Sequence, residues 1–158
     1  MRTNIGQGVA AAEGLAFNSL MGLIEWGERF KLEQPTIDSD HQKLFTLAER
    51  ACRISRTPAA IGELKDVFDE FGMVLKAHFN HEESELAKAR YGKLDEHRAE
   101  HAALLVEYEF IRQRLESIGP RPLYLEEALS ILNFMLGVTV GHILHSDAEY
   151  ATAMLKRA

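Results

Sequence analysis

The chain has 158 residues, of which 46% are hydrophobic and 27% are charged, and its formal net charge is −6. This length and composition are typical of one globular domain of ordinary size. Because the acidic sequence contains no block of basic residues, nucleic acid and anionic membrane surfaces are poor candidates as partners. The single cysteine, Cys52, cannot form an internal disulfide, which agrees with a reducing compartment.

The first 25 residues are interpreted as an N-terminal extension with some helical character. Glu13 and Asn18 interrupt its apolar run, so it matches neither a secretory leader nor a membrane span. A cytoplasmic protein is therefore expected. The large apolar side chains of the extension are expected to pack against the rest of the protein, because monomers rarely expose contiguous apolar patches. These side chains are Leu15, Leu20, Met21, Leu23 and Ile24.

The remaining chain, residues 26–158, predicts four helices and no strands. Ser39, with Gln42 three residues later, matches a capping box at the start of the first helix. Thr57 and Pro58 match the cap and first position of the second helix. The expected segments are about 39–55, 57–92, 95–118, and from near 122 almost to the C-terminus. Short connections between long helices favour antiparallel neighbours, so we expect an all-α, up-down antiparallel four-helix bundle.

Each predicted helix carries an apolar stripe whose members follow one another at steps of three and four residues. This spacing places the stripe on one buried face. At one end of every stripe the apolar residues give way to histidine or glutamate, and because the helices alternate in direction, all four polar ends are expected at the same end of the bundle. The polar members are His41, His78, Glu82, His97, His101 and His142.

Five histidines and a glutamate at core positions require a common binding partner. A buried, unpaired carboxylate costs several kcal/mol, and five imidazoles cannot all satisfy one another. A lone inward histidine is usually a hydrogen-bonded core residue, but the joint occurrence on four helices favours a metal centre. Ligation rich in imidazole suits iron, copper or zinc better than magnesium or calcium. The paired Glu-x-x-His motifs of ferritin-like di-iron proteins and the H-E-x-x-H helix of zinc proteases are missing.

The motifs around these residues resemble the hemerythrin family, in particular its bacterial single-domain members. In chain order they are Trp26, IDSDHQKLF (37–45), HFNHEE (78–83), HRAEH (97–101) and HILHSDAEY (142–150). The resemblance covers the chain from Trp26 to Tyr150. It implies a hemerythrin-like bundle over residues 26–158 and a non-haem centre of two iron ions joined by an oxo or hydroxo bridge. The implied iron ligands are His41, His78, His97, His101 and His142, with Glu82 and Asp147 as bridging carboxylates.

The implied ligand set leaves one coordination position open. If both irons are six-coordinate, five histidines, two bridging carboxylates and a bridging oxygen fill all positions except one. Reversible binding of dioxygen there, for storage, delivery or buffering by a protein that is not an enzyme, is the expected function, with azide or nitric oxide as other ligands. The alternative is an oxygen, nitric oxide or redox sensor, or a peroxide-consuming di-iron enzyme. The residues expected around the open position are Trp26, Phe45, Leu104, Leu105, Val138, Thr139 and Tyr150.

Other polar residues near these motifs are assigned less direct roles. His81 and His145 each lie three residues from an implied ligand, so they are expected behind the ligands or at the surface. Glu83 is expected on a solvated helix face. His145 and Glu149 repeat the i, i+4 spacing of His78 and Glu82 and so compete with His142 and Asp147, but His142 continues the apolar stripe.

The spacing of His142 and Asp147 makes a structural prediction of its own. Five residues correspond to about 140° around a regular α-helix, too far for both side chains to reach one centre. We therefore expect a π-like widened turn between them, a feature often found at functional sites.

Overall fold

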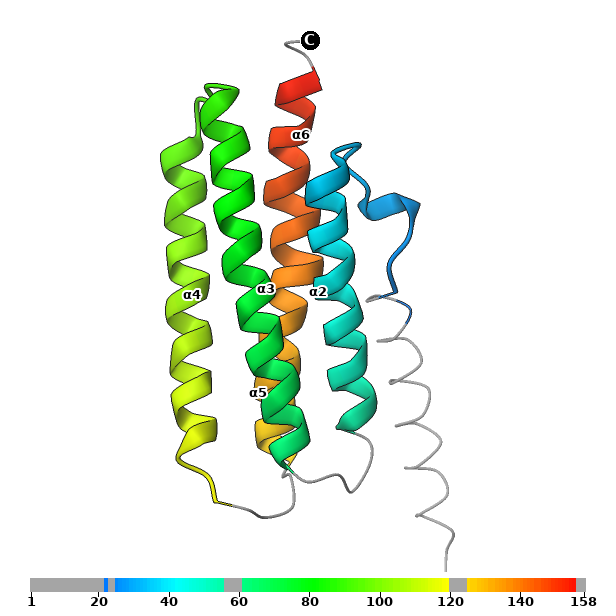
Figure 1. The fold of residues 1–158 in the computed structure, drawn as a ribbon, viewed down its shortest axis with the longest axis vertical. Helices are drawn as coiled ribbons and strands as arrows, with labels where there is room; N and C mark the ends of the chain where they lie inside the picture. The colour runs from blue at the N-terminus through cyan, green and yellow to red at the C-terminus, as the bar shows by residue number, and fades with distance from the viewer. Residues whose placement is uncertain (1–21, 23–24, 56–60, 120–124, 156–158) are drawn as a thin grey trace, which may run out of the picture.

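The computed structural model describes residues 22, 25–55, 61–119 and 125–155, which form an up-down four-helix bundle (Figure 1). A short 3-10 helix, η1 (Glu28–Phe30), precedes α2 (Pro35–Ile54), α3 (Ile61–Lys88) and α4 (Leu94–Glu116). The fourth helix is continuous through α5 (Leu125–Leu136), a π-helical stretch η2 (Gly137–Asp147) and α6 (Ala148–Leu155). No strand occurs in these ranges, and the predicted all-α bundle is confirmed.

The four helices pack so that the start of α2 and α4 and the end of α3 and α6 lie at one end of the bundle (Figure 1). Helix α3 packs against α2 and α4, and the fourth helix packs against the same two helices. The predicted meeting of the four polar stripe ends at one end of the bundle is therefore confirmed.

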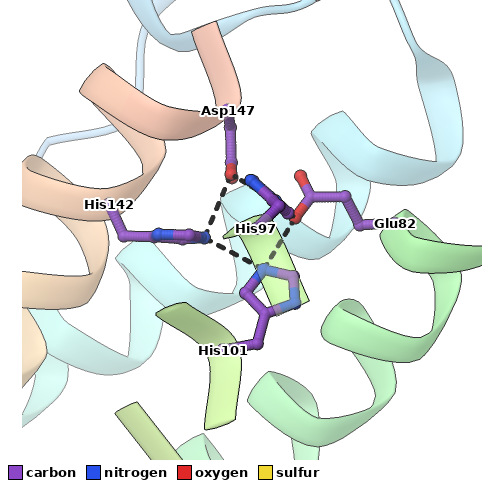
Figure 2. Close-up of side chains that lie close together, drawn as sticks. All are labelled: Glu82, His97, His101, His142 and Asp147. Carbon is purple, nitrogen blue, oxygen red and sulfur yellow. Dashed lines mark hydrogen bonds and ion pairs between the residues drawn. The ribbon is translucent and has the colours of Figure 1, made fainter. Parts of the chain in front are cut away.

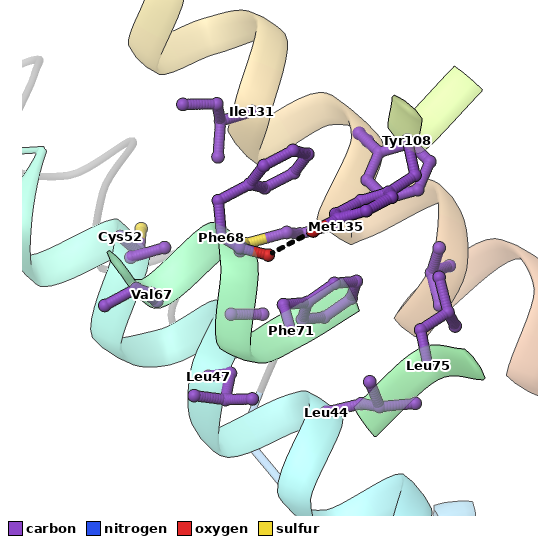
Figure 3. Packing of buried hydrophobic residues seen from close by; sticks show 14 of the residues in the cluster. Leu44, Leu47, Cys52, Val67, Phe68, Phe71, Leu75, Tyr108, Ile131 and Met135 are labelled. Atoms are coloured by element: carbon purple, nitrogen blue, oxygen red, sulfur yellow. Dashed lines mark hydrogen bonds between the residues drawn. The ribbon is translucent and has the colours of Figure 1, made fainter. Parts of the chain in front are cut away.

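The predicted stripes form the core. The stripe predicted for α3 is buried over its whole length, at Ile61, Leu64, Phe68, Phe71, Leu75, His78 and Glu82. Phe68, Phe71 and Leu75 pack with Ile131 and Met135 from α5 (Figure 3). Two members of the α4 stripe, Leu104 and Ile118, are only partly buried at the edge of this cluster. The periodic spacing thus predicted the inward faces correctly.

The predicted start of the first helix at Ser39 is wrong. Helix α2 begins one turn earlier, with Pro35 in the first turn, where its fixed φ suits a helix and its missing N–H leaves no donor unpaired. Asp38 replaces the expected cap, since its carboxylate accepts the backbone N–H groups of Leu32 at 2.7 Å and Gln34 at 3.2 Å. Ser39 is exposed inside the helix instead.

Some predictions fall on parts of the chain outside the described residues. These are the cap at Thr57 and Pro58 and the packing of the apolar side chains at residues 15–24. The division into an extension (1–25) and a bundle (26–158) also stays a prediction. The described part does show that Trp26 packs on the bundle, with its ring centroid 5.5 Å from that of Phe45 on α2.

One described stretch, Glu126–Ala153, is long and apolar enough to cross a membrane by length and composition. The same stretch supplies Ile131, Met135 and Val138 to the bundle core, and core helices of bundles meet this criterion as well.

Candidate metal centre

The structure brings together all seven residues that the sequence singled out as metal ligands. Glu82 on α3, His97 and His101 on α4, and His142 and Asp147 on the fourth helix point at one another from three helices (Figure 2). His41 on α2 and His78 on α3 join them from the other side, next to Glu82 and Asp147. Every one of the seven side chains is buried.

The five histidines form two groups. His101 Nε2 lies 3.1 Å from His142 Nε2, and His97 joins them through the oxygen Oε2 of Glu82. On the other side, His41 Nε2 lies 3.3 Å from His78 Nε2. Ligand atoms about 2.1 Å from a metal and at right angles around it lie about 3 Å apart. The nitrogen spacings within each group therefore fit ligands of a shared ion.

Asp147 connects the two groups. Its Oδ1 lies 3.1 Å from His142 Nε2 and 3.5 Å from His97 Nε2, whereas its Oδ2 lies 3.0 Å from His41 Nε2 and 3.7 Å from His78 Nε2. Each carboxylate oxygen thus faces a different group of histidines. A carboxylate placed in this way could offer one oxygen to a metal ion at each group of histidines.

The fourth helix carries both of its candidate ligands in a π-helical stretch. The stretch spans Gly137–Asp147 and includes His142 and Asp147, so the predicted widened turn is confirmed. A π turn takes about 4.4 residues rather than 3.6, which places residues five apart on nearly the same face. Thr139 lies in the same stretch and donates its hydroxyl to the Met135 carbonyl at 2.8 Å.

Several polar atoms of the centre have no hydrogen bond within the described part of the chain. They are Oε1 of Glu82, both oxygens of Asp147, and Nδ1 of His41 and His78, all of them buried. Buried polar groups are normally paired, because leaving one unpaired costs about 1–3 kcal/mol. Two carboxylates among five imidazoles, with orphaned oxygens, therefore fit bound cations, and the residues present suit a histidine-rich binuclear metal centre.

The electrostatics of the seven-residue centre point the same way. Burial opposes ionisation of Asp147, but His142, His41 and His78 hold the pKa of its carboxyl well below the usual range. Burial also disfavours a charged His78, yet Asp147, Asp40 and Glu82 raise its pKa to about 9. Without metal, protons occupy the places of cations, so metal binding here competes with protons.

Carboxylates behind the ligands were not anticipated. Glu83, which was expected on a solvated face, instead accepts the Nδ1–H of His101 at 2.7 Å, and that prediction is wrong. Asp40 lies between His78 and the half-exposed His81, whose Nδ1 is 2.8 Å from its oxygen. Burial disfavours the charge on Asp40, but these two histidines lower its pKa to about 2.

A phenylalanine also contributes to the centre without having been singled out as a site residue. The ring of Phe79 stacks on that of His101, with 3.7 Å between centroids, and contacts His142 edge-on. The only sequence signal for it was its place between His78 and the following polar run. The Phe79 ring therefore covers one side of the three-histidine group.

The residues predicted to line a ligand pocket are distributed around the centre. Trp26 lies beside His41, with 6.4 Å between ring centroids, and packs on Phe45. Tyr150 lies on the other side, 5.7 Å from His97, and burial beside Glu82 and Asp147 raises the pKa of its hydroxyl. Leu104 and Leu105 are half-buried against the core, and Val138 and Thr139 are fully buried. Their role as pocket lining stays a prediction.

The competing histidine–carboxylate pair lies apart from the centre. His145 and Glu149 are both exposed, and Glu149 pairs with Lys93. His81 lies behind His78 through Asp40, as an indirect role would require. The structure thus gathers His142 and Asp147, not His145 and Glu149, with the other candidate ligands.

The fold and the site together define a helical-bundle protein with a buried metal-binding centre of histidines and carboxylates. The chain belongs to the hemerythrin family, because the family model for the hemerythrin HHE cation binding domain matches residues 34–154. It is also 28% identical over 128 residues to a protein named Bacteriohemerythrin from Clostridium acetobutylicum. That match covers 79% of this chain and 96% of the relative.

Proposed function

We propose that this protein holds two iron ions at the seven-residue centre and binds dioxygen reversibly, for storage, delivery or local buffering. The single observation that carries the proposal is the division of the histidines into groups of three and two, with one Asp147 oxygen facing each group. The similarity to a bacteriohemerythrin and the family match support iron as the metal.

The unequal sizes of the two histidine groups support a position for the open coordination site. His97, His101 and His142 would hold one ion and His41 and His78 the other, while Glu82 and Asp147 would be shared by both. The ion with two histidines then has one ligand fewer, so the exogenous ligand belongs on the His41 side. Two irons held in this way supply electrons and one open coordination position to a small ligand.

The side chains around the His41 side suit a carrier better than a catalyst. Trp26 lies next to His41 and packs face-on against Phe30 and edge-on against Phe45, and none of these three side chains offers an acid or a base. The Thr139 hydroxyl is bonded to its own helix, and the raised pKa of Tyr150 keeps its proton on the phenol. An apolar surrounding of this kind excludes water and delays proton delivery to a bound ligand.

The proposal is tested by anaerobic reduction of the iron-loaded protein followed by stepwise addition of dioxygen, recorded optically. The expected absorption change saturates at about one dioxygen per chain. In a separate titration, azide added to the oxidised protein should bind at the same position. A protein that carries two irons but shows no saturable optical change with dioxygen or azide would contradict the proposal.

A further inference from the structure

The histidines of the two groups differ in what supports the far side of their rings. In the three-histidine group, His101 Nδ1 lies 2.7 Å from Glu83. His142 Nδ1 lies 3.3 Å from Glu100, and the Ser146 hydroxyl donates to the same Glu100 carboxylate at 2.6 Å. Two of the three rings are thus backed by carboxylates from the neighbouring helices.

The two-histidine group has weaker support. His41 Nδ1 is buried and has no hydrogen bond to any described residue. His78 Nδ1 lies 3.8 Å from Asp40 Oδ2, outside hydrogen-bond distance, while the same oxygen lies 2.8 Å from His81 Nδ1. Asp40 therefore bonds the half-exposed His81 in preference to the candidate ligand His78.

Such support changes how firmly an imidazole holds a metal. A carboxylate that accepts the Nδ1–H fixes the tautomer that presents Nε2 to the metal, fixes the ring orientation and increases the basicity of the ring. Loss of such a partner typically costs 10–100-fold in metal affinity. In this chain the group with more histidines is also the group in which a carboxylate lies behind two of the rings.

We propose that Glu83 and Glu100 are positioning residues that make the three-histidine site the tighter of the two metal sites, so that the protein loses its metals in two steps. The metal held by His41 and His78 leaves first, and the singly loaded protein keeps its metal at His97, His101 and His142. This inference rests on the proposed binuclear centre and adds an order of metal loss to it.

The test follows iron release from the reduced, iron-loaded protein under argon, with an excess of the ferrous chelator ferrozine. We expect two phases of one iron per chain each, with rates that differ by about tenfold or more. Native mass spectrometry between the phases should find chains with a single iron. Elemental analysis before chelation tests the binuclear centre separately, because a chain that never holds two irons refutes the proposed function itself.

Conservative variants identify the cause of the difference. Glu83→Gln and Glu100→Gln keep the size of the side chain but remove its charge, so each should accelerate the slow phase about 10-fold and leave the fast phase unchanged. Asp40→Asn should leave the slow phase unchanged. Glu107→Gln, an exposed charge on α4, is the matched control and should alter neither phase.

Thermal unfolding of each metal-free variant separates positioning from general damage, since a positioning role leaves the metal-free melting temperature near that of wild type. Release of both irons in one phase by the wild-type protein would overturn the inference. A slow phase that is unchanged in both glutamine variants would overturn the role of Glu83 and Glu100. If one variant fails to fold, the other still decides the question.

Discussion

At the scale of single side chains, Asp147 is the residue that connects the two histidine groups of the centre. Its carboxylate is fully buried, each oxygen faces a different histidine group, and neither has a hydrogen bond among the described residues. In an apolar core such a group would be strongly destabilising. Positive charge on the surrounding groups, from protonated imidazoles or from bound metal ions, is needed to make this arrangement favourable. Asp147 therefore matters more for what the centre binds than for packing.

Replacement of one histidine tests this view. His101→Ala removes a ligand whose ring is fixed by Glu83 and stacked on Phe79, so it should lose at least one of the two irons. His145→Ala, an exposed histidine on the fourth helix, should retain both. Elemental analysis of the two purified variants provides the measurement. Equal iron content in both would contradict the assignment of His101.

The metal-free protein should show a pH dependence set by the same residues. The pKa of His78 is raised from 6.5 to about 9, despite burial, by Asp147, Asp40 and Glu82. Its contribution to stability is therefore fully present below about pH 6.5 and is lost as the pH rises towards 9. The depressed pKa of Asp147 and of Glu82 contributes stability above about pH 4 that is lost as the pH falls.

Urea unfolding of the metal-free protein between pH 3 and pH 9.5 measures this dependence. We expect the greatest free energy of unfolding between about pH 4.5 and 6.5. The iron-loaded protein should not lose stability between pH 6.5 and 9, because metal ions replace the protons on the imidazoles. A metal-free protein whose stability stays constant from pH 6.5 to 9 would contradict the assigned environment of His78.

At the scale of helices, the contact between α3 and α4 depends on a residue without a side chain. A Cβ added to Gly72 would come within 2.0 Å of the Tyr108 ring, whose hydroxyl donates to the Phe68 carbonyl (Figure 3). Burial raises the pKa of that hydroxyl to about 12, so it remains a donor at any physiological pH. Gly72 therefore lets the two ligand-bearing helices approach each other closely.

Gly72→Ala should destabilise the bundle by about 1–3 kcal/mol, because the tyrosine ring must move and overpacked cores lose stability by about that amount. Gly62→Ala is the control: this glycine lies exposed on the same helix, and no atom of the described residues lies within 4 Å of its Cβ position. Alanine there should be neutral or stabilising by up to about 1 kcal/mol. Chemical denaturation compares the two. A Gly72→Ala protein as stable as wild type would show that the ring moves away without cost.

The sequence predicted the helices well where spacing alone decides the outcome. The inward faces of α2, α3 and α5 follow directly from steps of three and four residues, and the π-helical stretch follows from the five-residue interval between His142 and Asp147. The start of α2 was not predicted, because the capping-box pattern at Ser39 was followed, whereas the side chain of Asp38 caps the helix from its own first turn.

The support behind the ligands could not be predicted from spacing. Glu83 and Glu100 lie off the apolar stripes. Their roles depend on which histidine of the neighbouring helix lies beside them, and therefore on how the helices are aligned along the bundle axis. Asp40 and His81 contact each other across α2 and α3, a pairing that only the packed bundle reveals. The spacing of apolar residues within each helix does not predict how neighbouring helices are aligned, so these contacts could not be predicted.

At the scale of the whole molecule, the proposed metal centre ties together one end of all four helices. A ligand that binds only the folded state stabilises it by an amount that grows with concentration and affinity. Removal of iron by chelation should therefore lower the melting temperature substantially and broaden the transition. Calorimetry of matched loaded and metal-free samples measures the difference. Equal melting temperatures would contradict a centre that links α2, α3, α4 and the fourth helix.

The reversibility of oxygen binding tests the central proposal most directly. The reduced, iron-loaded protein is exposed to air, its absorption spectrum is recorded, and oxygen is then removed under vacuum while released hydrogen peroxide is assayed. We expect the spectrum of the oxygen-free protein to return over repeated cycles, with little peroxide and slow loss to the oxidised form. Immediate oxidation in air with stoichiometric peroxide and no return of the reduced spectrum would contradict the carrier function.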